Sequence, residues 1–333
     1  MKKGTFFCID AHTCGNPVRL VTSGHPELEG ETMGEKRIHF LKEFDWIRKG
    51  LMFEPRGHDM MSGAFLYPPC SKDSDAAILF IETSGCLPMC GHGTIGAITA
   101  GLEAGLIQGK ESGKLKIDVP AGQINVEYQI TDKKVDWVKI FNIASYLVHQ
   151  NLKINVPDLG EITLDIAYGG NFYAIIEPQK NYPGLESFSP EKILKYSPKI
   201  RDIAGKAVKC IHPEDPKVNG LSHVLWTGKP QKEGSSAANA VFYGDKAIDR
   251  SPCGTGTSAR MAQLFTKGLL KQNQEFVHES IIGSQFVGCI EQVTEVSGIT
   301  AIMPSIRGWA QVTGNNQIII DDDDPYASGF QLV

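Results

Sequence analysis

The chain has 333 residues, which is too long for one ordinary core and suits two α/β domains. Hydrophobic residues make up 41% and charged residues 21%, a globular composition that excludes wholesale disorder. The formal net charge of −5 gives no basic surface for nucleic acid or an anionic membrane. The longest apolar runs, such as residues 76–81, have the length of a strand, so we expect no membrane-spanning helix. The apolar stretch at 6–9 is too short for a signal peptide, and we expect a cytoplasmic protein.

The predicted elements repeat along the chain. Strands are expected around 9–21 and 76–81, with a surface helix between them over about 32–49. An apolar, buried helix is expected to begin after Cys90, followed by strands at 115–119 and 137–140. In the second half, a strand segment at 164–176 precedes a surface helix that opens at Ser189-Pro190, and another helix begins after Cys253.

Two pairs of segments indicate an internal duplication. CGHGTIGAITAGLEAGLI (90–107) matches CGTGTSARMAQLFTKGLL (253–270) at an offset of 163 residues. IDAHTCGNPVRLV (9–21) resembles LDIAYGGNFYAII (164–176) at an offset of 155. We therefore expect an α/β fold of two similar domains related by a pseudo-twofold axis, each a curved sheet around a central helix. The expected domains are 1–146, with 306–333 returning to it, and 147–305, with an active site in the cleft between them.

The eight cysteines show no CxxC pair and no disulfide-type spacing, so we expect reduced thiols and no metal site. Most are expected to be buried small hydrophobes. Cys90 and Cys253 differ because each precedes Gly-x-Gly-Thr at a predicted helix start. The positive end of a helix stabilises a thiolate and lowers its pKa, and the exposed N–H groups bind a carboxylate. Two thiols aimed at one carbon from opposite sides suit racemisation or epimerisation without a cofactor.

A dinucleotide-binding site is the weaker interpretation of the same residues. Gly91-x-Gly93-x-x-Gly96 satisfies the glycine fingerprint, but that fingerprint follows a strand directly. Here the strand is expected to end near Glu82, and the loop 83–89 intervenes.

The motifs PMCGHGTIG (88–96) and DRSPCGTGTSA (249–259) resemble the two signatures of the proline racemase family. The similarity runs from CIDAHTCGNP through FEPRGHDMM to the tail, and it is greatest to the epimerases of 4-hydroxyproline. It implies the fold of diaminopimelate epimerase, no cofactor, and Cys90 and Cys253 as the acid/base pair. The similarity also implies which residues bind the substrate. Its carboxylate would be bound by Gly91, His92, Gly254 and Thr255, and its ring amine would lie between His92 and Asp249. His223 would supply a further contact.

Within the family, Cys253 favours inversion over dehydration of 3-hydroxyproline, since the dehydratases typically carry Thr or Ser there. Proline racemases tend to line the ring pocket with Phe, whereas Ser62 and Tyr243 can pair a ring hydroxyl, which favours hydroxyproline over proline. His58 and Asp59 are assigned equally to the pocket wall or to a structural loop. The run 321–324 is expected to be a solvated turn and not a calcium site.

Two alternatives of another class stay open: a non-catalytic amino-acid-binding protein and a redox sensor that uses both thiols. The expected partner is a small-molecule substrate, hydroxyproline or proline, and a homodimer is left open.

Overall fold

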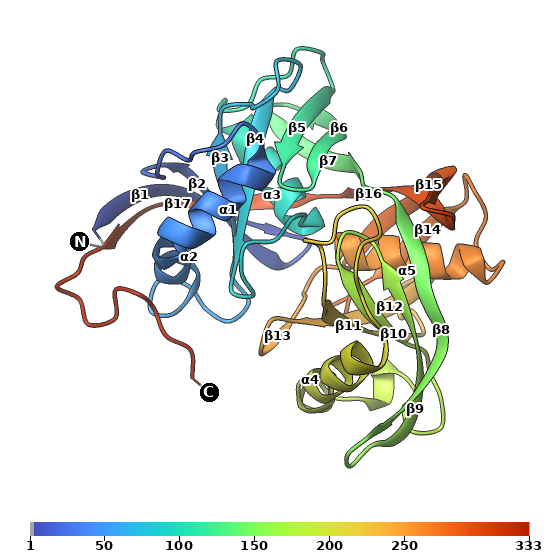
Figure 1. Ribbon diagram of the computed structural model, residues 1–333. Coiled ribbons are helices and arrows are strands. Elements are labelled where there is room, and N and C mark those ends of the chain that lie inside the picture. Colours follow the sequence, from blue (N-terminus) through green and yellow to red (C-terminus); the bar gives the residue numbers. More distant parts are fainter. Residues whose placement is uncertain (1–2, 333) are drawn as a thin grey trace. The chain divides into compact units, whose positions relative to one another are not determined.

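The computed structural model describes residues 3–332, which divide into two compact units. Unit 1 comprises residues 3–140 and 308–332, and unit 2 comprises residues 141–307. Each unit is a mixed β-sheet with helices on both of its faces (Figure 1).

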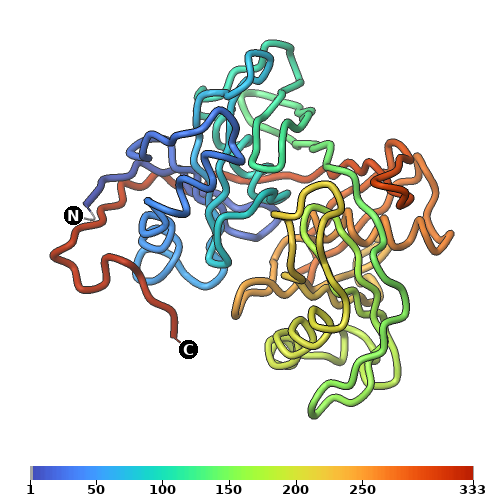
Figure 2. Tube along the Cα trace, viewed as in Figure 1, coloured from blue at the N-terminus to red at the C-terminus, as the bar shows by residue number. Residues whose placement is uncertain are grey.

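The sheet of unit 1 has the order β17-β1-β2-β3-β4-β5-β6. The pairs β2–β3 and β4–β5 are parallel, and the others are antiparallel. The last strand, β17, pairs with the first, β1, so two segments from opposite parts of the sequence run side by side (Figure 2). The strands are β1 (Gly4–Thr13), β2 (Asn16–Ser23), β3 (Ser62–Tyr67), β4 (Ala76–Glu82), β5 (Lys114–Val119), β6 (Gly122–Thr131), β7 (Lys134–Phe141) and β17 (Ala310–Ile320).

The strand pairings of unit 2 close on themselves, in the order β8-β9-β10-β11-β12-β14-β15-β16 and back to β8. The short strand β13 pairs with β12 outside this ring. The strands are β8 (Ser145–Val156), β9 (Gly160–Tyr168), β10 (Phe172–Ile176), β11 (Leu221–Gly228), β12 (Ala237–Tyr243), β13 (Ala247–Ile248), β14 (Glu275–Glu279), β15 (Gln285–Val296) and β16 (Ile299–Gly308).

The two units repeat the same pattern of pairings. The order β8-β9-β10-β11-β12-β14-β15 reproduces β17-β1-β2-β3-β4-β5-β6, with parallel pairs at the same two places. The helices also lie in matching connections. In unit 1, α1 and α2 lie between β2 and β3, and α3 lies between β4 and β5. In unit 2, η1 and α4 lie between β10 and β11, and α5 lies between β12 and β14. The duplication expected from the sequence is therefore present in the topology.

The central helices are α3 (Gly91–Glu103) and α5 (Gly254–Thr266), and both begin at the residue after the motif cysteine. Every residue of 91–101 and of 254–264 is buried, as expected for a helix enclosed by a sheet. The alternation of β10 shows how the sheet serves two cores. Phe172, Ala174 and Ile176 belong to the core that includes α4, whereas Tyr173 and Ile175 lie in the core that includes Cys253.

The outer helices differ in one respect from the sequence prediction. The helix α4 (Pro190–Ala207) begins after Ser189 as expected, with the 3-10 turn η1 (Leu185–Ser187) ahead of it. The single helix predicted over 32–49 is wrong, because the chain forms α1 (Met33–Glu43) and α2 (Asp45–Met52). Phe44 leaves the helical conformation, its N–H closes α1 on Phe40, and the carboxylate of Asp45 opens α2 by accepting from Arg48.

Among residues 3–332, no helix has both the length and the apolar character needed to cross a membrane.

Candidate active site

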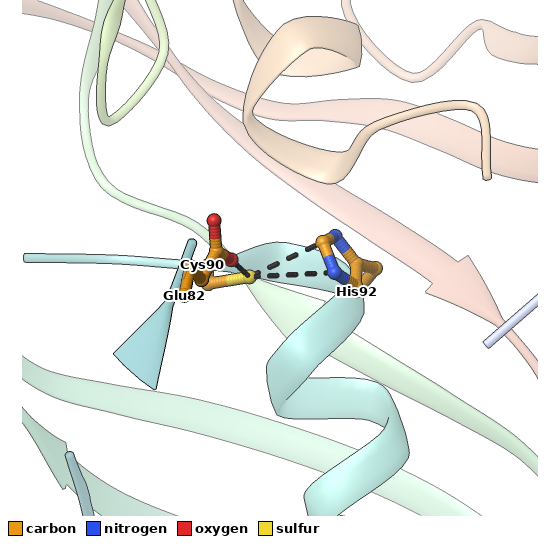
Figure 3. Close-up of side chains that lie close together, drawn as sticks. All are labelled: Glu82, Cys90 and His92. Carbon is orange, nitrogen blue, oxygen red and sulfur yellow. Dashed lines mark hydrogen bonds between the residues drawn. The ribbon is translucent and has the colours of Figure 1, made fainter. Parts of the chain in front are cut away.

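Cys90 is the N-cap residue of α3, and it lies in a cluster with Glu82 and His92 that we call the Cys90 cluster (Figure 3). The Cys90 thiol donates to Oε1 of Glu82 at 2.9 Å, and its Sγ lies 3.7 Å from Nδ1 of His92. The N–H of Gly93 donates to the same sulfur at 3.3 Å. A carboxylate, an imidazole and a helix N-terminus therefore surround one buried sulfur.

The imidazole of His92 is held from the neighbouring strands. Its Nε2 lies 2.9 Å from Oγ of Ser62, the first residue of β3, and 3.0 Å from Nδ2 of Asn16, the first residue of β2. The hydroxyl of Thr13 donates to the carbonyl of His92 at 2.8 Å. The sheet order that places β1, β2 and β3 side by side thus fixes the ring beside the thiol.

The Cys-Gly-x-Gly motif has the same steric reason in both units. A Cβ atom at Gly93 would lie 2.9 Å from Sγ of Cys90, and a Cβ at Gly256 would lie 3.0 Å from Sγ of Cys253. Any larger residue would push the sulfur from its place over the first helical turn. The repeated glycine therefore makes room for the repeated thiol.

Cys253 precedes α5 and lies in a second cluster, the Cys253 cluster, with Tyr173 and Thr255. The hydroxyl of Tyr173 is 3.4 Å from Sγ of Cys253 and 2.6 Å from Oγ1 of Thr255. The backbone of Cys253 has a φ of 63°, a region that residues with a side chain rarely adopt and that is common at functional sites.

The Cys253 thiol does not have the lowered pKa that its place at a helix start predicted. Burial raises the pKa of Cys253 well above the usual thiol value, and the negative charge of Asp249 raises it further. Hydrogen bonds from Tyr173 and from the N–H of Gly256 oppose this rise. Because only 6% of Cys253 is exposed, the loss of hydration outweighs the helix N-terminus, and the group is a thiol at neutral pH.

Two further residues predicted to bind substrate, Asp249 and His223, lie in unit 2 near this cluster, together with the predicted pocket-wall residue Tyr243. Asp249 is buried and accepts hydrogen bonds from the N–H and hydroxyl of Ser251, both at 2.8 Å. His223 contacts Tyr173 with a ring separation of 4.6 Å, and it stacks on Tyr243 at 6.2 Å. The predicted residues of unit 2 are therefore gathered around one helix start.

Two other segments considered from the sequence, residues 58–59 and 321–324, make hydrogen bonds or ion pairs within unit 1. Asp59 accepts a hydrogen bond from Gln331 at 2.9 Å, and the N–H of Met60 donates to Nδ1 of His58. These residues therefore lie in a loop that is held by hydrogen bonds. In the acidic run, Asp321 pairs with Lys3 at 2.8 Å and Asp324 with Arg56 at 2.9 Å.

Sequence reasoning missed Glu82 and Tyr173. The signal for Glu82 was a lone carboxylate at the end of an otherwise apolar strand, β4, which the structure buries. The signal for Tyr173 was its place in the repeated segment after Gly170-Asn171, which alternation directs to the inner face of β10.

The sequence matches the proline racemase family over residues 8–331, so the chain belongs to that family. It is 68% identical over 333 residues, 100% of both chains, to a protein of Shewanella loihica named 4-hydroxyproline 2-epimerase. Among solved structures, a hydroxyproline epimerase of Agrobacterium vitis with bound trans-4-hydroxy-L-proline is similar, with a TM-score of 0.88 and 28% identity over 98% of this chain and 96% of that one. A phenazine biosynthesis protein of the PhzF family from Bacillus anthracis shares the fold, with a TM-score of 0.60 and 17% identity over 96% of this chain and 99% of that one.

Proposed function

We propose that this protein is an isomerase that inverts the α-carbon of 4-hydroxyproline, converting trans-4-hydroxy-L-proline to cis-4-hydroxy-D-proline. The observation that carries the proposal is the pair of buried thiols, Cys90 and Cys253, at matching helix starts in two similarly built units. Inversion needs a base on one face of the carbon and an acid on the other. A pseudo-twofold arrangement of the two units, with the substrate in the cleft between them, would supply both.

The proton balance of the proposed reaction is simple. One cysteine, as thiolate, takes the α-proton, and the other, as thiol, delivers a proton to the opposite face. After the turnover the two sulfurs have exchanged protonation states, and the reverse reaction uses them in the opposite order. The raised pKa of Cys253 supports its role as the thiol before the first turnover. The reaction requires no cofactor.

The first turns of the two central helices are proposed to bind the substrate carboxylate through the N–H groups of Gly91, His92, Gly254 and Thr255. His92 and Asp249 are proposed to flank the ring amine, and Asp249 supplies the negative charge for a secondary ammonium. His223 is a further binding residue in this proposal, and its ring contacts with Tyr173 and Tyr243 support a fixed ring position.

The preference for a hydroxylated ring is proposed to come from Ser62 and Tyr243. A site that pairs a substrate hydroxyl discriminates strongly against an analogue without one, because its own polar groups are then left unpaired. The position of Ser62, 2.9 Å from the imidazole of His92, supports this role. The names of the relatives given above point to the same substrate. A homodimer and a cytoplasmic location stay predictions.

The experiment is incubation with trans-4-hydroxy-L-proline, L-proline or trans-3-hydroxy-L-proline in D2O, followed by optical rotation and NMR of the α-position. We expect inversion with α-deuterium incorporation, fastest for 4-hydroxyproline. Faster inversion of proline would make the protein a proline racemase, and loss of water from 3-hydroxyproline would make it a dehydratase. Binding without any exchange of the α-proton would identify a non-catalytic binding protein.

A further inference from the structure

We propose that Glu82, Cys90 and His92 form a binding site for a thiophilic divalent cation such as Zn2+, and that the bound cation withdraws Cys90 from catalysis. The proposal of binding stands on the geometry of the Cys90 cluster. The proposal of inhibition rests on the proposed function.

The cluster offers one sulfur, one nitrogen and one oxygen donor, all within 4.8 Å of one another. The exposed fractions of Glu82, Cys90 and His92 are 2%, 4% and 5%, so the donors are shielded from bulk water. Thiolate, imidazole and carboxylate are the ligands that Zn2+ takes in proteins, and three of them with a water complete a tetrahedron. The same set disfavours Mg2+ and Ca2+, which prefer oxygen ligands alone.

The three donors are carried by rigid elements and are oriented by outer partners. Glu82 ends β4, Cys90 caps α3, and His92 lies in the first turn of α3, so the sulfur sits between carboxylate and imidazole (Figure 3). Ser62 lies 2.9 Å from Nε2 of His92, and both ring nitrogens lie near the sulfur, Nδ1 at 3.7 Å and Nε2 at 3.9 Å. The Ser84 hydroxyl donates to Oε2 of Glu82 at 3.2 Å while Oε1 faces the thiol. Such outer partners are usual around metal-binding histidines and carboxylates.

The charges of the cluster suit a cation. The Cys90 thiol donates a hydrogen bond to the buried carboxylate of Glu82 at 2.9 Å. Binding would replace that proton: the S–H bond breaks, a sulfur–metal bond forms, and the proton leaves to solvent. The 2+ charge then neutralises thiolate and carboxylate together.

The Cys253 cluster lacks this donor set. The partners of Cys253 are the hydroxyls of Tyr173 and Thr255, and within residues 3–332 the Cys90 cluster is the one group of three such donors this close together. The two matched cysteines thus serve as each other's controls, because both are buried thiols at the start of a central helix.

The test is a titration of the full chain, reduced and freed of metal with a chelator, using Co2+ as the optical probe and Zn2+ in calorimetry. We expect one equivalent per chain and a near-ultraviolet thiolate-to-cobalt band. Cys90→Ser should remove the band, and Cys253→Ser should keep it. Glu82→Gln should weaken Zn2+ binding by more than about tenfold, and Ser62→Ala by about tenfold. Circular dichroism checks that each variant is folded.

Several results would overturn the proposal. They are the absence of a thiolate-to-cobalt band, an equal loss in Cys253→Ser and Cys90→Ser, and binding that Glu82→Gln leaves unchanged in a folded protein. In the activity arm, Zn2+ should inhibit epimerisation in competition with substrate, and a chelator should restore it. Full activity with the site saturated would overturn the inhibitory role. Metal binding by a protein without epimerase activity would overturn the proposed function and leave the metal site standing.

Discussion

The hydroxyl of Tyr173 lies 3.4 Å from Sγ of Cys253, whereas the matching sulfur of Cys90 lies 2.9 Å from a carboxylate oxygen of Glu82. The two thiols occupy equivalent places in a repeated fold, but one faces a neutral phenol and the other an acid. The two thiols are therefore chemically different before any substrate binds. We expect the pKa of each thiol to depend on different neighbouring groups.

Replacement of Cys253 by Ser should abolish epimerisation while leaving part of the chemistry. A hydroxyl has a far higher pKa than a thiol, so it neither gives nor takes the proton efficiently. The rate of epimerisation should fall by about 10²–10⁴-fold or more. Cys90 should still exchange the α-proton of one epimer with deuterium, and slow dehydration of 3-hydroxyproline is the gain to look for. The measurement is α-proton exchange on each epimer separately. Cys70→Ser, outside both clusters, is the control, and full activity of Cys253→Ser would contradict the two-thiol mechanism.

Iodoacetamide should alkylate mainly one cysteine per active site, and substrate should protect it. The reagent reacts with thiolates, and the raised pKa of Cys253 keeps that group protonated. The Cys90 thiol donates to a carboxylate of Glu82 that can take up its proton, so we expect the label on Cys90. Peptide mass spectrometry with and without 4-hydroxyproline identifies the site. Equal labelling of all eight cysteines, unaffected by substrate, would count against this assignment.

Replacement of Asp249 by Asn should lower both affinity and turnover, because it removes the charge proposed to face the substrate ammonium. The amide oxygen can still accept from Ser251, so the local fold should persist. The negative charge of Asp249 raises the pKa of Cys253, and its loss should therefore lower that pKa. The limb of the pH–rate profile that reports Cys253 should move to lower pH. Unchanged kinetics would mean that Asp249 only stabilises the local turn through its hydrogen bonds with Ser251.

Replacement of Tyr173 by Phe should move the limb of the pH–rate profile that reports Cys253 to higher pH, opposite to the effect of Asp249→Asn. The hydrogen bond from Tyr173 lowers the pKa of Cys253, so its removal should raise that pKa and shift the limb to higher pH. The ring and its packing against His223 are kept. Opposite shifts in Tyr173→Phe and Asp249→Asn would assign the limb to Cys253, and shifts of the same sign would refute that assignment.

The protein should lose stability as the pH falls below about 6.5, through His278. Burial lowers the pKa of His278 from 6.5 to about 3, so the unfolded chain binds a proton that the folded one refuses. This difference should lower the free energy of unfolding by about 2 kcal/mol between pH 7 and pH 5. The loss should be smaller in His278→Gln and unchanged in His149→Gln, whose histidine is exposed. Thermal unfolding followed by circular dichroism at the two pH values is the measurement.

The sequence alone predicted the features that depend on neighbours along the chain. The starts of α3, α5 and α4 at Gly91, Gly254 and Pro190 were predictable, because caps and glycines act within one helical turn. The duplication was predictable because both copies of the motif keep the glycine that leaves room for the sulfur. The break at Phe44 was not, since both helices share an amphipathic pattern that runs on through it.

Only the tertiary structure decided which groups surround each thiol. Tyr173 is 80 residues from Cys253 and Ser62 is 30 residues from His92, and they meet because the order of the strands makes them neighbours. The pKa of Cys253 was misjudged for the same reason. A helix start can be identified in a sequence, but burial depends on the whole fold, and here the loss of hydration outweighs the field of one helix.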